Sequence, residues 1–361
     1  MEMLTKKKKI LMVFLYCILV FMFFESMSRS LLSLRPFMKK IRTYDNDSYW
    51  KNRWLKKSRE KDVRFFMHIY DPIRGWAVKP NMRDVVIYDG IMTVSSNSKG
   101  IRGKVEYPYK KSEGKIRILI FGDSFTFGEG VNDTETYAYY LQEMLPDTEV
   151  INLGVMGYGH DQMLLYLKEE GVKYKPDIVI LGSICIDDIR NLLSFRDYAK
   201  PRFVLVGNKL KLTNVPVPTP QSILRNELFK PKILTLLSLL KRRQRATLIA
   251  EKRKITEAIL AEIAKTINSI GAIPIFVYLP SGGEIEDLTG ERNPDEDFLF
   301  ELCKRIKARC FSLCQYFQDN VRKGNALQVR GHWDAKEHRL AAEGIKEYLI
   351  DNKIKNIQTP R

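Results

Sequence analysis

A serine and a histidine that lie far apart in the chain are the residues best suited to act together. Ser124 follows an apolar run at residues 118–121 and precedes a helical pattern, which places its hydroxyl where a nucleophile is exposed. His332 lies in a loop before the last predicted helix, from which an imidazole can reach over a sheet. Such a pair performs nucleophilic catalysis, because the imidazole takes the hydroxyl proton while the oxygen attacks a carbonyl carbon.

Two other interpretations of Ser124 do not involve catalysis. Its side chain can cap the helix that follows it. The glycines around it can instead cradle a phosphate, but the chain lacks the G-x-x-x-x-G-K-[ST] spacing of a P-loop.

The chain contains three further histidines. His160 follows the second predicted strand, where it is either a substrate contact or the first residue of a helix. His338 lies inside the last predicted helix and is interpreted as structural, and we expect no role for His68. No H-E-x-x-H or C-x₂-C spacing occurs, so we expect neither a metal nor another cofactor.

The elements that must position these residues alternate along the second half of the chain. Strands are expected at apolar runs and helices at the amphipathic stretches between them. The expected strands are 118–121, 150–153, 178–181, 273–278 and 310–313, and the expected helices are 134–145, 160–172, 248–270, 296–308 and 335–351. This alternation predicts an α/β fold with a mostly parallel sheet covered on both faces and a site at the carboxyl ends of its strands.

Three short segments resemble the motifs of the SGNH (GDSL-like) hydrolase family. Gly122-Asp123-Ser124 resembles its first block, residues 152–159 its second and residues 331–335 its last, and the likeness covers about 115–350 together with 96–102. The resemblance implies a flavodoxin-like three-layer α/β/α fold and a serine esterase or acyltransferase. It also implies Ser124 as nucleophile, His332 as base, and the N–H groups of Ser124 and Gly157 as the oxyanion hole.

Two positions depart from the family pattern. Ile186 stands where the family has an oxyanion asparagine, and such a donor is worth about 2.7–4 kcal/mol in the transition state. Arg330 and Val329 stand where the family has an aspartate that orients the histidine, whose loss approaches ~10⁴ in rate. The alternative function is therefore a non-catalytic binding protein that has kept the fold. The carboxylates that remain as candidate supporting groups are Asp123, Asp187 and Asp334.

The N-terminus has the layout of a membrane signal. Four lysines, Lys6–Lys9, precede an uncharged apolar run at 10–24 that ends at Glu25. We expect residues 1–28 to be an uncleaved signal anchor, the alternatives being a cleaved signal peptide or a buried core helix. The expectation is a membrane-anchored protein with an extracytoplasmic globular domain.

The net charge of +17 is concentrated in two segments. Residues 1–60 hold 14 Lys and Arg against 5 Asp and Glu, residues 221–255 hold 10 against 2, and the rest of the chain is neutral. We expect a basic linker at 29–60, a β-rich appendage at 61–113, and an α/β domain at 114–354 with an insertion at 195–247. Trp50 and Trp54 in the linker suit a lipid interface, although a solvated linker fits as well.

Within the insertion, Leu234, Leu237 and Leu240 share one helical face ahead of the basic cluster 241–245. The segment is either an amphipathic helix on an anionic membrane or a helix packed on the body with its cations in solvent. We expect lipid contact through residues 10–24, and through 233–245 only in the first of these two cases. The family resemblance implies a substrate that is an acyl ester of a cell-envelope saccharide or of a lipid. Nucleic acid is not an expected partner, since no binding motif accompanies the charge, and the oligomeric state is not predicted.

The composition excludes other classes of protein. Hydrophobic residues make up 45% and charged residues 29%, which is typical of a globular domain and excludes a disordered tail, a collagen and a multi-span membrane protein. Five cysteines in 361 residues also exclude a disulfide scaffold. The close set Cys303, Cys310 and Cys314 is expected to be buried, a disulfide being the alternative for an extracytoplasmic domain.

Overall fold

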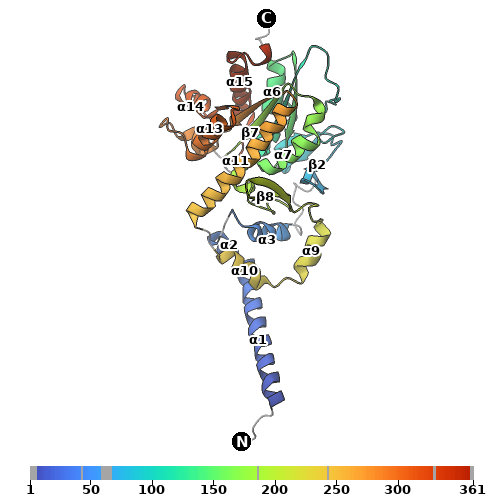
Figure 1. The fold of residues 1–361 in the computed structure, drawn as a ribbon, viewed down its shortest axis with the longest axis vertical. Helices are drawn as coiled ribbons and strands as arrows, with labels where there is room; N and C mark the ends of the chain where they lie inside the picture. The colour runs from blue at the N-terminus through green and yellow to red at the C-terminus, as the bar shows by residue number, and fades with distance from the viewer. Residues whose placement is uncertain are drawn as a thin grey trace.

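A five-stranded parallel sheet forms the centre of the protein (Figure 1). The computed structural model describes residues 6–41, 44–57, 67–184, 187–241, 244–327 and 331–357. The strand order is β11-β10-β7-β5-β6, and every neighbouring pair is parallel. The strands are β5 (Ile116–Gly122), β6 (Thr148–Gly154), β7 (Ile178–Ser183), β10 (Ile273–Tyr278) and β11 (Arg309–Ser312). All five predicted strands are confirmed, as is the α/β fold.

Each face of the sheet is covered by its own hydrophobic core. Leu119 and Phe121 of β5 belong to one core, whereas Ile118 and Ile120 belong to the other, because neighbouring side chains of a strand point to opposite faces. The first core packs against α7 (His160–Glu169), α11 (Arg245–Ser269) and α13 (Pro294–Ile306). The second packs against α6 (Tyr137–Met144), α14 (Cys314–Arg322) and α15 (Ala335–Asp351). Burial on both faces explains why these strands are continuously apolar.

Small elements surround the carboxyl edge of the sheet. The appendage consists of two antiparallel pairs, and the insertion begins with an antiparallel hairpin and continues into two helices. The elements are β1 (His68–Asp71), β2 (Gly75–Val78), β3 (Val85–Ile87), η1 (Tyr88–Gly90), β4 (Met92–Val94), β8 (Arg202–Val206), β9 (Lys209–Thr213), α9 (Pro220–Leu228) and α10 (Lys232–Leu240). The remaining short helices are α5 (Ser124–Phe127), η2 (Asp133–Glu135), η3 (Gly171–Tyr174), α8 (Asp187–Arg190), α12 (Gly282–Glu286) and η4 (Ile354–Asn356).

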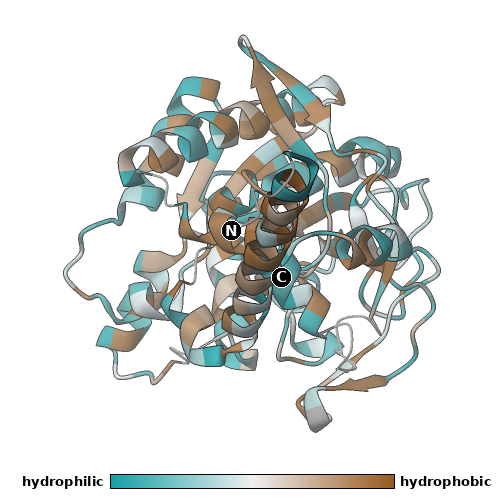
Figure 2. Ribbon diagram, turned by 90° about the horizontal axis from the view of Figure 1, so that it is seen from below, coloured by the Kyte–Doolittle hydropathy of each residue, from teal (hydrophilic) through white to brown (hydrophobic). Residues whose placement is uncertain are grey.

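The N-terminal region is helical. Helix α1 (Lys6–Ser33) extends beyond the predicted limit at residue 28 and is followed by α2 (Arg35–Lys40) and α3 (Asp47–Lys57). The apolar part of α1 projects away from the body (Figure 1). This helix is long and apolar enough to cross a membrane, and none of its most apolar stretch is buried. Figure 2 shows the protein from the side of α1, coloured by hydropathy.

The two tryptophans of α3 correct our interpretation of the linker. Trp50 and Trp54 are only 3% and 4% exposed, so they lie neither at a lipid interface nor in solvent. The Asp47 carboxylate accepts hydrogen bonds from the N–H groups of Ser194 and Phe195, at 3.0 and 3.1 Å, and thereby ties α3 to the body. The sparse apolar residues of α3 are thus a buried face.

Two of the three clustered cysteines are buried as expected, whereas Cys310 is only half-buried. Cys303 lies in α13, but that helix ends at Ile306 with Lys307 in the left-handed conformation (φ 54°), so Cys310 lies on β11. Helix and strand still place the two side chains close enough to share a hydrogen bond. Cys303, Cys310 and Cys314 are free thiols in the structure, the first and last of them buried.

Candidate active site

The fold brings together the serine and the histidine that the sequence singles out. The Ser124 Oγ atom lies 2.8 Å from Nε2 of His332, although 208 residues separate them in the chain. Ser124 is 5% exposed, whereas the His332 side chain is about one third exposed. The exposed side of the pair is therefore the imidazole side. The Phe125 ring, 5.0 Å from the imidazole centre, limits the rotation of His332. This distance is within the range at which an imidazole accepts a hydroxyl proton.

Close packing at the end of β5 fixes the serine. Ser124 begins the single-turn helix α5, and the Asp123 carboxylate caps that turn by accepting a hydrogen bond from the Phe125 N–H at 2.9 Å. The turn lies directly against β5 and β6. A Cβ atom at Gly122 would lie 1.9 Å from Thr126 Oγ1, and one at Gly154 would lie 2.4 Å from the Phe127 nitrogen. Glycine is therefore required at both strand ends.

Gly157 lies in the turn after β6, where the second predicted oxyanion donor was expected. Its φ of +80° is a conformation that glycine adopts without strain. A Cβ atom there would also lie 2.4 Å from Oδ2 of Asp197. Neither the Ser124 N–H nor the Gly157 N–H has a hydrogen-bond acceptor among the described residues.

A buried arginine connects the serine turn with two neighbouring segments. The Arg190 Nη1 atom donates to Asp123 Oδ2 at 2.8 Å, to Asp187 Oδ1 at 2.5 Å and to the Tyr158 carbonyl at 2.8 Å. Burial and the charge of Asp123 raise the pKa of Asp187, which the Arg190 charge opposes. Asp123 and Asp187 thus both pair with the Arg190 guanidinium. Among the described residues, neither carboxylate contacts His332.

A carboxylate that the sequence analysis missed lies beside the histidine. Oε2 of Glu129 is 3.5 Å from His332 Nε2, and its Oε1 accepts a 2.6 Å hydrogen bond from the Tyr88 hydroxyl. The loop that carries Glu129 is held by Arg102, which is buried and donates to the carbonyls of Phe127 and Gly128 at 2.5 Å. The signal in the sequence was the flanking Gly128-Glu129-Gly130, five residues after the serine.

The other candidate residues occupy structural positions. Asp334 caps α15 by accepting hydrogen bonds from the N–H groups of Lys336 and Glu337, at 2.8 and 3.4 Å. His338 accepts a 3.2 Å hydrogen bond from the Tyr137 N–H, and burial lowers its pKa to about 3.

His160 is fully buried, and its Nε2 is 2.9 Å from the Ser183 hydroxyl. Burial, with the charge of Arg190, lowers its pKa to about 3. This placement favours the helix-start interpretation of His160 over a substrate contact. The departures at Ile186, Val329 and Arg330 lie outside the described residues.

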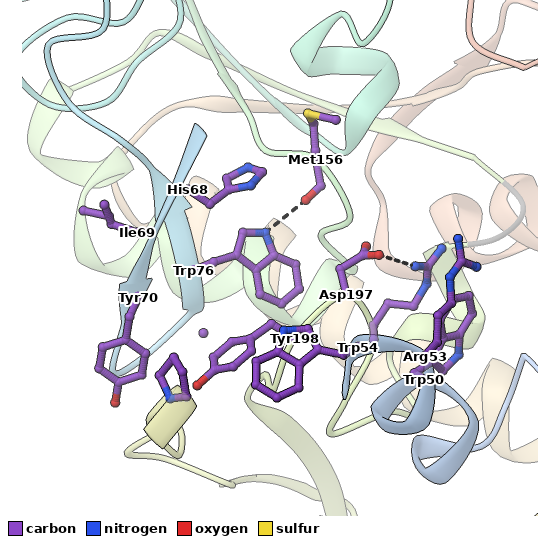
Figure 3. A pocket seen from close by; sticks show the side chains of 13 residues that line it. Trp50, Arg53, Trp54, His68, Ile69, Tyr70, Trp76, Met156, Asp197 and Tyr198 are labelled. Carbon is purple, nitrogen blue, oxygen red and sulfur yellow. Dashed lines mark hydrogen bonds and ion pairs between the residues drawn. The ribbon is translucent and has the colours of Figure 1, made fainter. Parts of the chain in front are cut away.

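An aromatic pocket of about 90 Å³ lies close to Gly157, and Figure 3 shows its lining residues. Trp76 and Asp197 form its wall on that side, since a Cβ atom at Gly157 would meet both. Trp76 is fixed by a 3.0 Å hydrogen bond from its Nε1 to the Met156 carbonyl. Helix α3, β1, β2 and the loop after α8 supply the rest of the lining, including Trp50, Trp54, Tyr70, Arg196 and Tyr198.

Comparisons with known proteins give only distant structural likenesses. No family model and no curated protein matches the chain. Among solved structures, an acetyl xylan esterase is 14% identical at a TM-score of 0.41, over 65% of this chain and 100% of the other. A two-domain esterase active on acetylated mannans is 14% identical at 0.40, over 69% and 52%. A catalytic mutant of an acetylxylan esterase from Geobacillus stearothermophilus is 14% identical at 0.38, over 65% and 94%. Scores this low carry no conclusion about family or activity.

Proposed function

We propose that the protein is a serine esterase or acyltransferase that acts on acyl esters through Ser124 and His332. The observation that carries the proposal is the 2.8 Å contact between Ser124 Oγ and His332 Nε2. His332 takes the hydroxyl proton as the oxygen attacks the acyl carbonyl, and the N–H groups of Ser124 and Gly157 hold the developing oxyanion. The imidazolium then returns the proton to the leaving alcohol, and water or a second hydroxyl releases the acyl group.

In this proposal Glu129 supports the histidine in place of the missing aspartate. The imidazolium that forms when His332 accepts the proton carries a positive charge 3.5 Å from Glu129 Oε2. A carboxylate at that distance stabilises the charged intermediate over the neutral resting state. The contribution is smaller than that of a triad aspartate, because Glu129 faces the same nitrogen as Ser124 and does not orient Nδ1.

We further propose that the aromatic pocket receives the alcohol half of the ester, with a saccharide as the substrate class. Aromatic rings offer flat apolar faces to a sugar ring, and the Arg196–Asp197 ion pair offers groups that bind hydroxyls. The Asp197 carboxylate lies directly beside Gly157 and hence beside the proposed oxyanion site. In the same proposal, α1 anchors the protein in a membrane.

The test is hydrolysis of p-nitrophenyl acetate and of acetylated oligosaccharides by the full-length protein in detergent. We expect turnover that is lost in Ser124→Ala and kept in Ser269→Ala, an exposed serine at the end of α11 that serves as the matched control. Binding of oligosaccharides without turnover would favour the non-catalytic alternative. Turnover that persists in Ser124→Ala would refute the proposed mechanism.

A further inference from the structure

Helices α9 and α10 present large apolar side chains to the outside of the protein. One face of this segment is ordinary core, where Ile223, Leu236 and Leu239 are at most 6% exposed. Six other residues of the segment are 42–83% exposed, namely Leu224, Leu228, Phe229, Leu234, Leu237 and Leu240. We call these six residues the α9–α10 apolar face. The surface of a soluble protein seldom exposes so many large apolar side chains within 17 residues. We therefore expect a binding partner to cover them.

Helix α10 is attached to α1 at one defined level. The Glu25 carboxylate accepts hydrogen bonds from the N–H groups of Lys232 and Ile233, at 2.9 and 3.1 Å. These N–H groups belong to the first turn of α10, which lacks a side-chain cap of its own. Glu25 therefore caps α10 across more than 200 residues of sequence and fixes its position along α1.

Glu25 also marks the end of the apolar part of α1. Residues 10–24 are uncharged and lie outside the protein body, and at 1.5 Å per residue they extend about 22 Å. When this run is embedded in a bilayer, its last turn lies at the membrane surface. The cap then holds α10 at that surface, with its exposed leucines beside the emerging helix. Figure 1 shows α10 at the junction of α1 with the body.

Cations accompany the apolar face. Lys241 and Arg245 follow α10, and Arg35, Lys39 and Lys40 on α2 are exposed close to the end of α1. Helix α2 contacts α1, and α10 contacts both α1 and α3, so these cations belong to the same end of the molecule. Exposed leucines with neighbouring Lys and Arg are the features of a helix that lies in the interface of an anionic bilayer.

We propose that the α9–α10 apolar face is a second membrane-binding element, which inserts into the surface of an anionic bilayer next to α1. This inference rests on the proposed membrane insertion of α1, though not on catalysis. Two contacts join α10 to α3, and they give the proposed membrane binding a functional consequence. The Ser238 carbonyl accepts a 2.9 Å hydrogen bond from Asn46 Nδ2, and the Ser238 and Ser48 hydroxyls lie 3.1 Å apart. Helix α3 is thereby fixed on α10.

The opposite side of α3 lines the aromatic pocket through Trp50 and Trp54. The contacts thus run from α1 through α10 and α3 to the pocket beside Gly157. With two attachments to the bilayer, the body has a fixed orientation, and the carboxyl edge of the sheet faces the membrane. Helices α10 and α3 then lie between the membrane surface and the aromatic pocket.

The test is photocrosslinking of the full-length protein in nanodiscs that contain phosphatidylcholine with phosphatidylglycerol. A benzoylphenylalanine is placed at position 237 or 229 in the apolar face, at position 19 in α1, or at position 91 in the appendage. Leu237, Leu19 and Ile91 are matched in being 57%, 65% and 66% exposed. We expect lipid adducts at 237, 229 and 19, none at 91, and a lower yield at 237 in nanodiscs of phosphatidylcholine alone. Esterase turnover is measured on the same samples.

The outcomes separate the possible occupants of this face. Lipid adducts at 19 but not at 237 or 229 would refute the second attachment, and crosslinks from 237 to a second copy of the chain would assign the face to a dimer instead. Absence of lipid adducts at position 19 would refute the membrane insertion on which the inference depends. Loss of turnover with intact adducts at 237 would leave this inference standing and count only against the proposed catalysis.

Discussion

The imidazole of His332 has a hydroxyl and a carboxylate on the same side of its ring. Nε2 is 2.8 Å from Ser124 Oγ and 3.5 Å from Glu129 Oε2. Glu129 is itself held by the Tyr88 hydroxyl, so the appendage contributes to the site through η1. A proton that moves from Ser124 to His332 would leave the new positive charge next to a fixed negative one, which lowers the barrier to transfer.

Replacing Glu129 by Gln keeps the shape of the side chain and removes its charge. Because an interaction with a charged group is worth about 1.5–3 kcal/mol, kcat/KM should fall by about 10- to 150-fold. KM should change little, since the effect acts on the transition state. Steady-state kinetics on p-nitrophenyl acetate provides the measurement, with Glu301→Gln, an exposed residue of α13, as control. Unchanged kcat/KM in Glu129→Gln would remove Glu129 from the mechanism.

Arg190 offers a prediction about stability. Its substitution by Gln leaves the buried carboxylates of Asp123 and Asp187 without their cation, which costs about 3–5 kcal/mol. Arg305→Gln is the control, because its pair with Glu257 is exposed and worth at most about 1 kcal/mol. Thermal unfolding in detergent should show a large loss of Tm for the first variant only. Similar losses for both would mean that the buried ion pairs do not support the serine turn.

At the scale of residues, sequence reasoning paired Ser124 with His332, and the structure shows a 2.8 Å contact between them, whereas their catalytic role stays a prediction. With four histidines to consider, the loop position of His332 and the resemblance of residues 331–335 to the last family motif selected it, and the structure places it beside Ser124. Glu129 and Arg190 were not predicted, because their roles depend on contacts between separate loops. Carboxylates and arginines are also too common in the chain to be recognised from spacing alone.

At the scale of elements, the packing of α15 against α6 places an imidazole in the core. His338 accepts a hydrogen bond from the Tyr137 N–H and is 1% exposed. Burial lowers its pKa to about 3. In the unfolded chain the same group titrates near its ordinary pKa of about 6.5. Unfolding therefore takes up a proton between these two values, and the stability from this histidine is lost as the pH falls from about 6.5 toward 3.

His338→Gln removes this proton uptake and should flatten the acid side of the stability profile. A single buried imidazole contributes up to about 1.4 kcal/mol per pH unit in that window. His160 has a similarly low pKa, so the variant should retain part of the slope. Urea unfolding at pH 7, 6 and 5 measures the effect as a difference in slope from the unmodified protein. Equal slopes would show that His338 is not buried in its neutral form.

Strands were easier to predict than helices. The five strands of the sheet are buried on both faces, so their apolar runs are visible without any knowledge of their neighbours. Helix α3 was not predicted, because its buried tryptophans are separated by Lys51, Asn52 and Arg53, which resemble a basic linker. Only the insertion that packs against α3 makes those tryptophans core residues, and that pairing joins segments almost 150 residues apart.

At the scale of the whole molecule, the basic charge gathers at one end. Helices α1 and α2 and the segment after α10 hold many of the exposed cations, while the α/β body is close to neutral. Most of the net charge thus lies in the segments around α1 and α10 and not in the α/β body. Counting charged residues along the sequence predicted the two basic segments. It did not predict that α1 and α10 meet in space, because that contact depends on the Glu25 carboxylate capping α10.

A prediction about extraction from membranes follows from the proposed anchor. The native protein should remain in the pellet after a wash with alkaline carbonate, because an embedded apolar helix is bound almost irreversibly. A chain in which Phe14 and Leu19 are both replaced by Glu should be released or fail to insert, because both side chains are exposed along α1. Release of the unmodified protein by carbonate would contradict the proposed anchor.

The central claim is that Ser124 is a nucleophile activated by His332, and active-site labelling measures this most directly. A fluorophosphonate probe is added to the full-length protein, and the modified residue is located by mass spectrometry. The account predicts phosphonylation of Ser124, no label in Ser124→Ala, and labelling slowed by more than about a hundredfold in His332→Ala. Absence of label on Ser124, or an equal labelling rate in His332→Ala, would contradict it.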